Sequence, residues 1–181
     1  MEHLLADLRY DFRRHKDLAE RALGHLDDQE FFRRPADHVN PVALIVKHLA
    51  GNLLSRWSDF LTTDGEKPTR NRDGEFVLNE SDTRANLLAA WECGWATLFE
   101  TVHTLQDADL EKSIMIRGEA HTAYQALLRG MAHAAYHTGQ ILYVVRLLRP
   151  GSTWLTVPPG QSQRVPGGYH KRVFAAQERP C

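Results

Sequence analysis

Residues 124–145 read YQALLRGMAHAAYHTGQILYVV and decide the fold, because Arg129 is the only formally charged side chain among them. A helix that is apolar almost all round normally packs at the centre of a protein and not on its surface. We expect this helix to run from about His121 to Leu148. It also carries two histidines one helical turn apart, His133 and His137.

Three further segments have helical periodicity and would pack around this central helix. Apolar residues recur with a period near 3.6 residues in segments 3–28, 41–61 and 81–106. Asn40 with Pro41, and Ser81 or Asp82, are residue types that begin helices. Four long helices without a sheet predict an all-α protein, specifically a four-helix bundle.

The connections between these helices differ in length. Residues 28–39 are polar, contain Pro35 and would join the first two helices. Residues 62–79 are rich in charges and turn formers, which predicts a long loop between helices two and three. Loops of that length usually serve a site, so we expect a rim or a lid. Residues 114–117 are the only extended piece that we predict, and one short strand cannot form a sheet.

Composition restricts the function. The chain has 181 residues, 43% of them hydrophobic, which suits one domain; we expect it over residues 1–160, followed by an irregular, mobile tail over 161–181. A formal net charge of −1 with interspersed charges predicts no binding to nucleic acid or to a membrane. Only two cysteines, Cys93 and Cys181, and no long apolar segment favour a reducing cytoplasm. We expect Cys93 to pack in the core.

His133 and His137 are candidate metal ligands, together with His48. Residues at i and i+4 share one face of a helix, so two imidazoles can bind one cation, and a third from a facing helix would complete the site. Leaving a buried imidazole nitrogen unpaired costs about 1–3 kcal/mol. The pair could equally be hydrogen-bonded residues of the core. Ala134 stands where a His-Glu-x-x-His protease has its glutamate, which excludes that class.

Two long stretches resemble the DinB-like superfamily of bacterial four-helix-bundle metalloproteins. Residues 40–57 (NPVALIVKHLAGNLLSRW), the loop segments FLTTDGEKP and RNRD, and residues 133–141 (HAAYHTGQI) are similar to a branch of small uncharacterised proteins. The resemblance spans about residues 3–160. It implies that His48, His133 and His137 bind a divalent ion, Zn or Ni first and Mn or Fe otherwise, and that the protein is a homodimer. Nothing is carried over beyond Ser162.

Some members of that superfamily are similar to thiol S-transferases that use bacillithiol or mycothiol. The resemblance therefore implies a metal-dependent transferase acting on a small molecule, with a low-molecular-weight thiol as cosubstrate that the ion would deprotonate. One alternative is a metal-activated hydrolase, for which the sequence shows no obvious general base. Another is a non-enzymatic binding module. Three histidines without a fourth ligand argue against a closed structural metal site.

Two amides could support the histidines. Asn52 lies one turn after His48, and Gln140 lies three residues after His137. Each could orient a ligand or a metal-bound water from outside the coordination sphere. Helix packing and hydrogen bonding between helices would explain both residues equally well.

Arginines near the candidate site could bind a substrate. Arg56, Arg70 and Arg72 could hold a carboxylate or phosphate at the rim through paired hydrogen bonds. A solvated loop would also explain Arg70 and Arg72. Glu92 and Tyr136 have acid–base chemistry, but no spacing places either of them near the metal. No catalytic residue is therefore assigned from the sequence.

Overall fold

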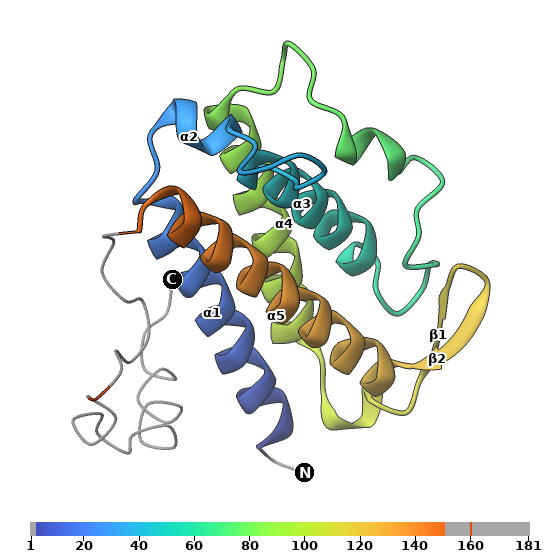
Figure 1. Cartoon of the computed structure of the whole chain (residues 1–181). Helices are drawn as coiled ribbons and strands as arrows, with labels where there is room; N and C mark the ends of the chain where they lie inside the picture. The colour runs from blue at the N-terminus through green and yellow to red at the C-terminus, as the bar shows by residue number, and fades with distance from the viewer. Residues whose placement is uncertain (1–2, 151–159, 161–181) are drawn as a thin grey trace.

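Helices make up most of the protein in a computed structural model that describes residues 3–150 and residue 160 (Figure 1). The long helices are α1 (Leu4–Leu23), α3 (Val42–Trp57), α4 (Arg84–Thr104) and α5 (Ala123–Leu148). Helix α1 packs against α4 and α5, and α3 packs against the same two helices. The prediction of a helical protein is confirmed.

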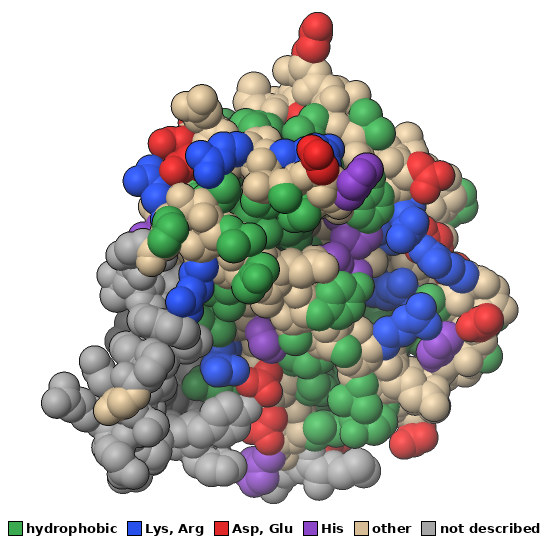
Figure 2. Space-filling model, viewed as in Figure 1, with side chains coloured by type: hydrophobic (Ala, Val, Ile, Leu, Met, Phe, Trp, Pro, Cys, Tyr) green, Lys and Arg blue, Asp and Glu red, His purple; other side chains and the backbone are tan. Residues whose placement is uncertain are grey.

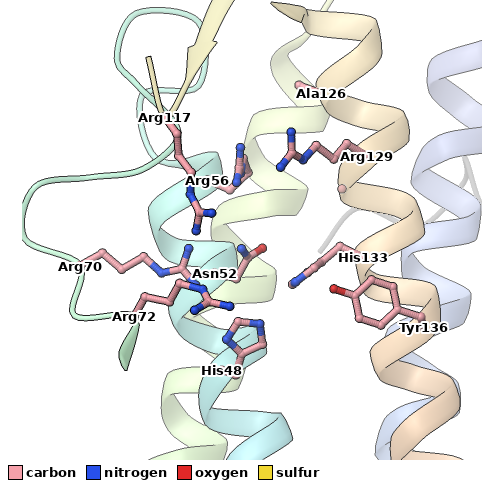
Figure 3. Close-up of a pocket in the computed structure, with 11 residues that line it drawn as sticks. His48, Asn52, Arg56, Arg70, Arg72, Arg117, Ala126, Arg129, His133 and Tyr136 are labelled. Atoms are coloured by element: carbon pink, nitrogen blue, oxygen red, sulfur yellow. The ribbon is translucent and has the colours of Figure 1, made fainter. Parts of the chain in front are cut away.

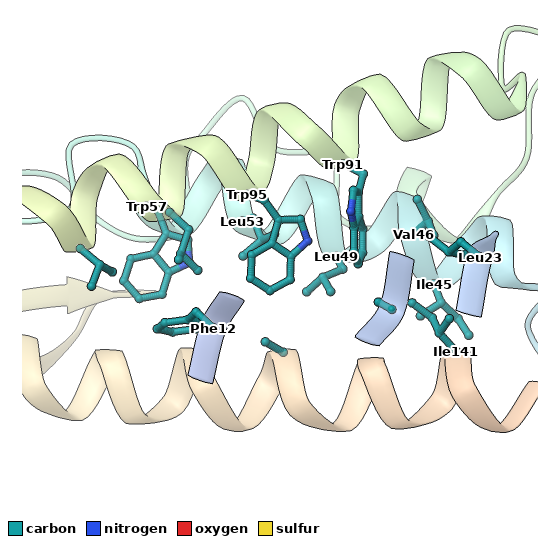
Figure 4. Close-up of a cluster of buried hydrophobic side chains, with 14 of the residues drawn as sticks. Phe12, Leu23, Ile45, Val46, Leu49, Leu53, Trp57, Trp91, Trp95 and Ile141 are labelled. Carbon is teal, nitrogen blue, oxygen red and sulfur yellow. The ribbon is translucent and has the colours of Figure 1, made fainter. Parts of the chain in front are cut away.

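The core lies between these four helices, and its largest side chains lie where α3 meets α4. Trp57, Trp91 and Trp95 are fully buried there, and the rings of Trp91 and Trp95 lie 5.6 Å apart (Figure 4). Phe12 of α1 meets Trp57 edge-on, with ring centroids 5.7 Å apart. Large aromatic side chains at the centre fix the spacing of the helices around the candidate site.

Helix α5 is less enclosed than its composition predicts. It buries one face against α1 and α3, but Tyr124, Leu128, Tyr136, Tyr143 and Leu147 on the opposite face are exposed. In this arrangement every long helix has an outer face, so an apolar helix cannot be enclosed by the other three. The expectation of a fully central helix is therefore wrong.

The segment after α1 is also helical, contrary to the sequence prediction. Helix α1 ends at Leu23, five residues before the expected limit, and a short helix α2 (Asp28–Phe32) follows. Asp27 and Glu30 form a capping box, in which each side chain accepts a hydrogen bond from the other's backbone N–H. Phe31 is fully buried. Capping and burial of one aromatic ring outweigh the polar composition of this segment.

A β-hairpin precedes α5, so the prediction that residues 114–117 are the only extended piece, and that no sheet forms, is wrong. Strand β1 (Ser113–Ile116) pairs antiparallel with β2 (Glu119–Thr122). Arg117 and Gly118 at the turn have φ of 55° and 75°, the positive values that a two-residue type I′ turn requires. A 3-10 turn, η2 (Asp107–Asp109), links α4 to the hairpin.

A long loop connects α3 to α4, as predicted, but it spans residues 58–83 and not 62–79, because α3 already ends at Trp57. The loop contains a short 3-10 helix, η1 (Asp73–Phe76), packed on α3. Ser55 of α3 anchors the loop. Its buried hydroxyl donates to the carbonyl of Gly65 at 3.0 Å and accepts from the amide of Lys67 at 2.9 Å. One side chain thereby holds the backbone on both sides of residue 66.

The loop is also joined to the hairpin. The carboxylate of Asp64 accepts hydrogen bonds of 2.8 Å from the amides of Arg117 and Gly118. The amide of Gly65 donates to the carbonyl of Met115 at 2.9 Å. We call this set of contacts the Asp64 clasp. It brings the turn of the hairpin next to the α3 end of the loop.

Three smaller predictions can be compared with the structure. Cys93 is exposed on α4, because it lies two residues after the inward-facing Trp91 and so points away from the core. The proposed mobile tail, with Cys181, lies outside the described residues. Within the described part of the chain, no helix combines the length and apolarity needed to cross a bilayer.

Candidate metal centre

The three histidines come together where α3 faces α5. His48 and His137 are buried and His133 is half-buried, and one ring nitrogen of each lies within 4.8 Å of the other two. Bonds from Zn²⁺ to imidazole nitrogen are about 2.0–2.1 Å long, so small side-chain rotations can close this triangle around one ion. The trio could hold a metal.

His48 is held by a carboxylate that sequence reasoning missed. Its Nδ1 donates to Oε2 of Glu75, in η1, at 2.8 Å, which leaves Nε2 available as a ligand. Glu75 is also gripped by Arg70, whose Nε and Nη2 donate to its two oxygens at 2.7 and 2.8 Å. Carboxylates bonded to metal-binding imidazoles fix the ring orientation and raise its basicity.

Glu75 reaches His48 because residue 51 has no side chain. A Cβ at Gly51 would lie 2.3 Å from Oε1 of Glu75, so any larger residue would displace the carboxylate. Burial alone would raise the pKa of Glu75, but hydrogen bonds from His48 and Arg70 lower it below its ordinary value. Glu75 is therefore ionised at neutral pH.

His137 has its own partner within α5. Its Nδ1 lies 2.8 Å from Oε1 of Gln140, the amide suggested by the sequence. The other nitrogen, Nε2, is buried and has no hydrogen-bond partner among the described residues. An orphaned imidazole nitrogen that faces two other histidines is the donor arrangement that a metal ion would complete.

The histidines of α5 are neutral in the folded chain. Burial, with a smaller contribution from neighbouring His137 and His48, lowers the pKa of His133 to about 3. Burial likewise lowers the pKa of His137 to about 4, although its bond to Gln140 opposes the shift. A neutral imidazole is the form that binds metals.

A cavity of about 180 Å³ opens beside the trio (Figure 3). His48 and His133 line one part of it, and Asn52 lies next along α3. The structure places the other predicted substrate-binding residues around the same cavity: Arg56, Arg70 and Arg72.

The sequence predicts that all three arginines lie at the rim and bind a substrate, but the structure gives each of them a different position and different partners. Arg56 is buried, not at the rim, with only 8% of its surface exposed. Arg70 is occupied by Glu75 and also donates to Glu66 at 3.1 Å, so it belongs to the support of His48. Arg72 is half-exposed and lies over the ring of Phe76.

Three more lining residues with polar side chains were not predicted: Arg117, Arg129 and Tyr136. Arg129 could have been found, because it lies four residues before His133 and is the lone charge of an apolar helix. No spacing in the sequence places Tyr136 near the metal, yet its ring lies 5.1 Å from that of His133. Arg117 comes from the hairpin turn, whose position no spacing reveals. Glu92 lies away from the cavity, on α4, and pairs with Lys16.

Comparison with known proteins places the chain at the level of a family. Residues 1–161 match a family described as "Protein of unknown function (DUF1572)". No curated protein and no solved structure gives a significant match.

Proposed function

The chain belongs to the DUF1572 family, and we propose that it is a divalent-metal-binding protein with the DinB-like four-helix-bundle fold that acts as a metal-dependent transferase. Its substrate would be a small molecule and its cosubstrate a low-molecular-weight thiol. The likeness of its sequence to that superfamily supports the fold, and the histidine trio supports the metal.

One observation carries the proposal: Nε2 of His137 is buried without a partner, among the part of the chain that the structure describes, where two other imidazoles converge. Leaving that nitrogen unpaired costs about 1–3 kcal/mol. His48, His133 and His137 would hold the ion, for which we propose Zn²⁺ or Ni²⁺, with Mn²⁺ or Fe²⁺ as the alternatives.

When bound, a divalent ion would lower the pKa of a coordinating thiol and so supply a nucleophile at neutral pH. The protein's own groups do the rest. Glu75 and Gln140 hold two imidazoles with their Nδ1 atoms occupied, which directs Nε2 of each ring to the ion. Tyr136, at the open side of His133, is placed to contact the substrate.

Transfer fits the cavity better than hydrolysis does. Attack by water is aided by a general base within reach of the ion, because an ion such as Zn²⁺ lowers the pKa of bound water only to about 7. None of the described residues that line the cavity is Asp or Glu, and both oxygens of nearby Glu75 are bonded to Arg70 or His48. A thiol needs no such base, since the ion alone suffices to deprotonate it.

We further propose that the protein is a cytoplasmic homodimer. Exposed large apolar side chains on the outer face of α5, Tyr143 and Leu147 among them, support self-association, because apolar surface gathered on one face of a small protein commonly marks an interface. Light scattering coupled to gel filtration measures the mass of the particle, and a strictly monomeric protein at micromolar concentration would contradict the dimer.

Metal analysis tests the proposal. We expect about one ion per chain in protein purified without chelator or histidine tag, and its loss from His48→Ala and from His133→Ala/His137→Ala. His103→Ala is the matched control, since His103 is exposed on α4. Circular dichroism checks that each variant is folded.

Cobalt substitution then tests the thiol. Addition of a low-molecular-weight thiol to the cobalt protein should shift its visible absorption spectrum. Wild-type protein that stays metal-free after incubation with Zn²⁺, Ni²⁺ and Mn²⁺ would overturn the metal site, and an unchanged cobalt spectrum would overturn the thiol cosubstrate.

A further inference from the structure

We infer that the cavity beside the histidine trio binds the anionic group of a small molecule, a carboxylate or a phosphate, and that Arg56, Arg117 and Arg129 hold it. The inference rests on the proposed function, since it names the substrate class of the same site. It differs from the sequence prediction, in which Arg70 and Arg72 accompanied Arg56 at the rim.

Arg56 is the strongest support. Its side chain is more than nine-tenths buried, and Nη1 has no hydrogen-bond partner in the region the structure describes. It forms no ion pair with a described carboxylate. Burying a guanidinium without a paired anion costs free energy of folding, so the buried charge of Arg56 indicates that an anionic ligand pairs with it.

The electrostatic surroundings of Arg56 agree. Burial, followed by repulsion from Arg129, lowers the pKa of Arg56 to about 10. Arg70 and Arg117 act in the same direction, and only Glu66 opposes them among the main contributors. The field at this guanidinium is positive, which favours an anion over a neutral ligand.

The loop holds Arg56 in position. A Cβ at Gly65 would lie 3.0 Å from Cδ and 3.1 Å from Nη1 of Arg56, so the guanidinium packs directly on that backbone. The carbonyl of Gly65 is in turn fixed by Ser55. Arg56 is thus preorganised, and little side-chain entropy remains to be lost when an anion binds.

Arg117 and Arg129 approach from two other elements, the hairpin turn and α5 (Figure 3). Among described groups, the only hydrogen-bond partner of Arg129 is His121, whose Nε2 lies 3.3 Å from Nη1. Nε of Arg117 donates to Oε2 of Glu66 at 3.3 Å, and Arg70 donates to the same oxygen. Planar guanidinium groups donate paired hydrogen bonds that match the oxygens of carboxylates and phosphates.

The cavity has two chemically different ends. In Figure 3, Arg56, Arg117 and Arg129 lie at one end and His48 and His133 at the other. Figure 2 shows several blue cationic side chains and purple histidines on the side where the hairpin lies. A small molecule anchored by its anionic group at the arginines would present a second, reactive group to the histidines.

Binding of two simple anions tests the inference. Sodium phosphate and sodium succinate are titrated into the full chain by calorimetry and by thermal melting, with and without added Zn²⁺. Succinamide is the uncharged comparison and sodium chloride controls ionic strength. We expect both anions, or the one whose chemistry the substrate shares, to bind and to raise the melting temperature.

Three variants assign the site. Arg56→Met and Arg129→Met should bind the anion about tenfold more weakly or worse, because each loses charge-assisted hydrogen bonds. Arg14→Met, exposed on α1, is the matched control and should bind as wild type does. Arg56→Met should also melt at a higher temperature than wild type without anion, which a merely structural arginine would not do.

The outcomes are separable from those of the metal site. No binding of either anion, or binding undiminished in both Arg56→Met and Arg129→Met, would overturn the inference. Binding of phosphate alone identifies a phosphate-bearing ligand, and binding of succinate alone a carboxylate. Wild-type protein that binds an anion through these arginines but holds no metal would overturn the proposed function and leave the anion site in place.

Discussion

His48 and Leu49 are adjacent in α3, and both are buried, yet they face different regions of the molecule. Leu49 packs into the dry core against α4, with Leu53 and Trp57 following on the same side (Figure 4). His48 faces the cavity, with Arg56 two turns further on. Side chains on both sides of the helix are buried, but those on one side are apolar and those on the other are polar or charged. The core side stabilises the fold and leaves one polar atom without a partner among the described residues, Nε1 of Trp95. The cavity side leaves two, Nη1 of Arg56 and Nε2 of His137, and each costs stability.

The core side should control the free energy of unfolding. Leu49→Ala removes a fully buried side chain, and such substitutions cost about 2–5 kcal/mol. Urea denaturation of the metal-free protein measures the loss. The folded fraction of Leu49→Ala should still bind metal, because all three histidines remain.

His48→Ala is the matched variant on the cavity side. It should lose metal binding but cost the metal-free protein less than Leu49→Ala does, since Glu75 keeps Arg70 as its partner. Equal destabilisation by the two substitutions would remove the distinction between the two sides of α3.

The support of His48 should affect metal binding more than stability. Glu75→Gln preserves the size of the side chain but removes the charge that orients His48, and losses of this kind weaken metal affinity about 10–100-fold. Competition with a chromogenic chelator measures the affinity. Glu80→Gln, exposed in the same loop, is the control. Unchanged affinity in Glu75→Gln would show that Glu75 only anchors the loop.

The cavity side should also make the metal-free protein sensitive to acid. Burial lowers the pKa of His133 to about 3 and of His137 to about 4, while both lie near 6.5 in the unfolded chain. Below pH 6.5 the unfolded chain therefore binds more protons than the folded one, and stability falls as pH falls. Between pH 7 and 6 the pair should cost about 1 kcal/mol.

Denaturation at the two pH values measures this loss. His133→Gln/His137→Gln should show a smaller loss, and any contribution from His15, whose pKa burial also lowers, is common to both proteins. An identical pH dependence in the double variant would mean that the two histidines are not the groups that titrate.

Periodic parts of the molecule were predictable from sequence. The helical class and the ends of α5 followed from apolar spacing, and the i, i+4 spacing of His133 and His137 placed both on one face. Short elements were missed because their signals are local. A capping box stabilises the start of α2, and a two-residue turn joins the strands of the hairpin.

The supporting residues of the site were harder to predict. Glu75 lies in an aperiodic loop 27 residues from His48, and nothing in its spacing indicates that pairing. Arg117 depends on the path of a hairpin that was not expected. Arg129 was visible as the lone charge of α5, but a lone charge does not tell which way it points. Periodicity locates residues within one helix, whereas contacts between loops depend on the whole fold.

The Asp64 clasp has a consequence for motion at the mouth of the cavity. Backbone amides in an exposed hairpin turn usually exchange their hydrogens with solvent within moments, yet those of Arg117 and Gly118 are bonded to a carboxylate from a distant loop. Neither segment can open without breaking these bonds. The backbone amides of the loop and of the hairpin should therefore exchange with deuterium at a common rate, because the two segments open together. A molecule bound in the cavity would slow the exchange of both segments.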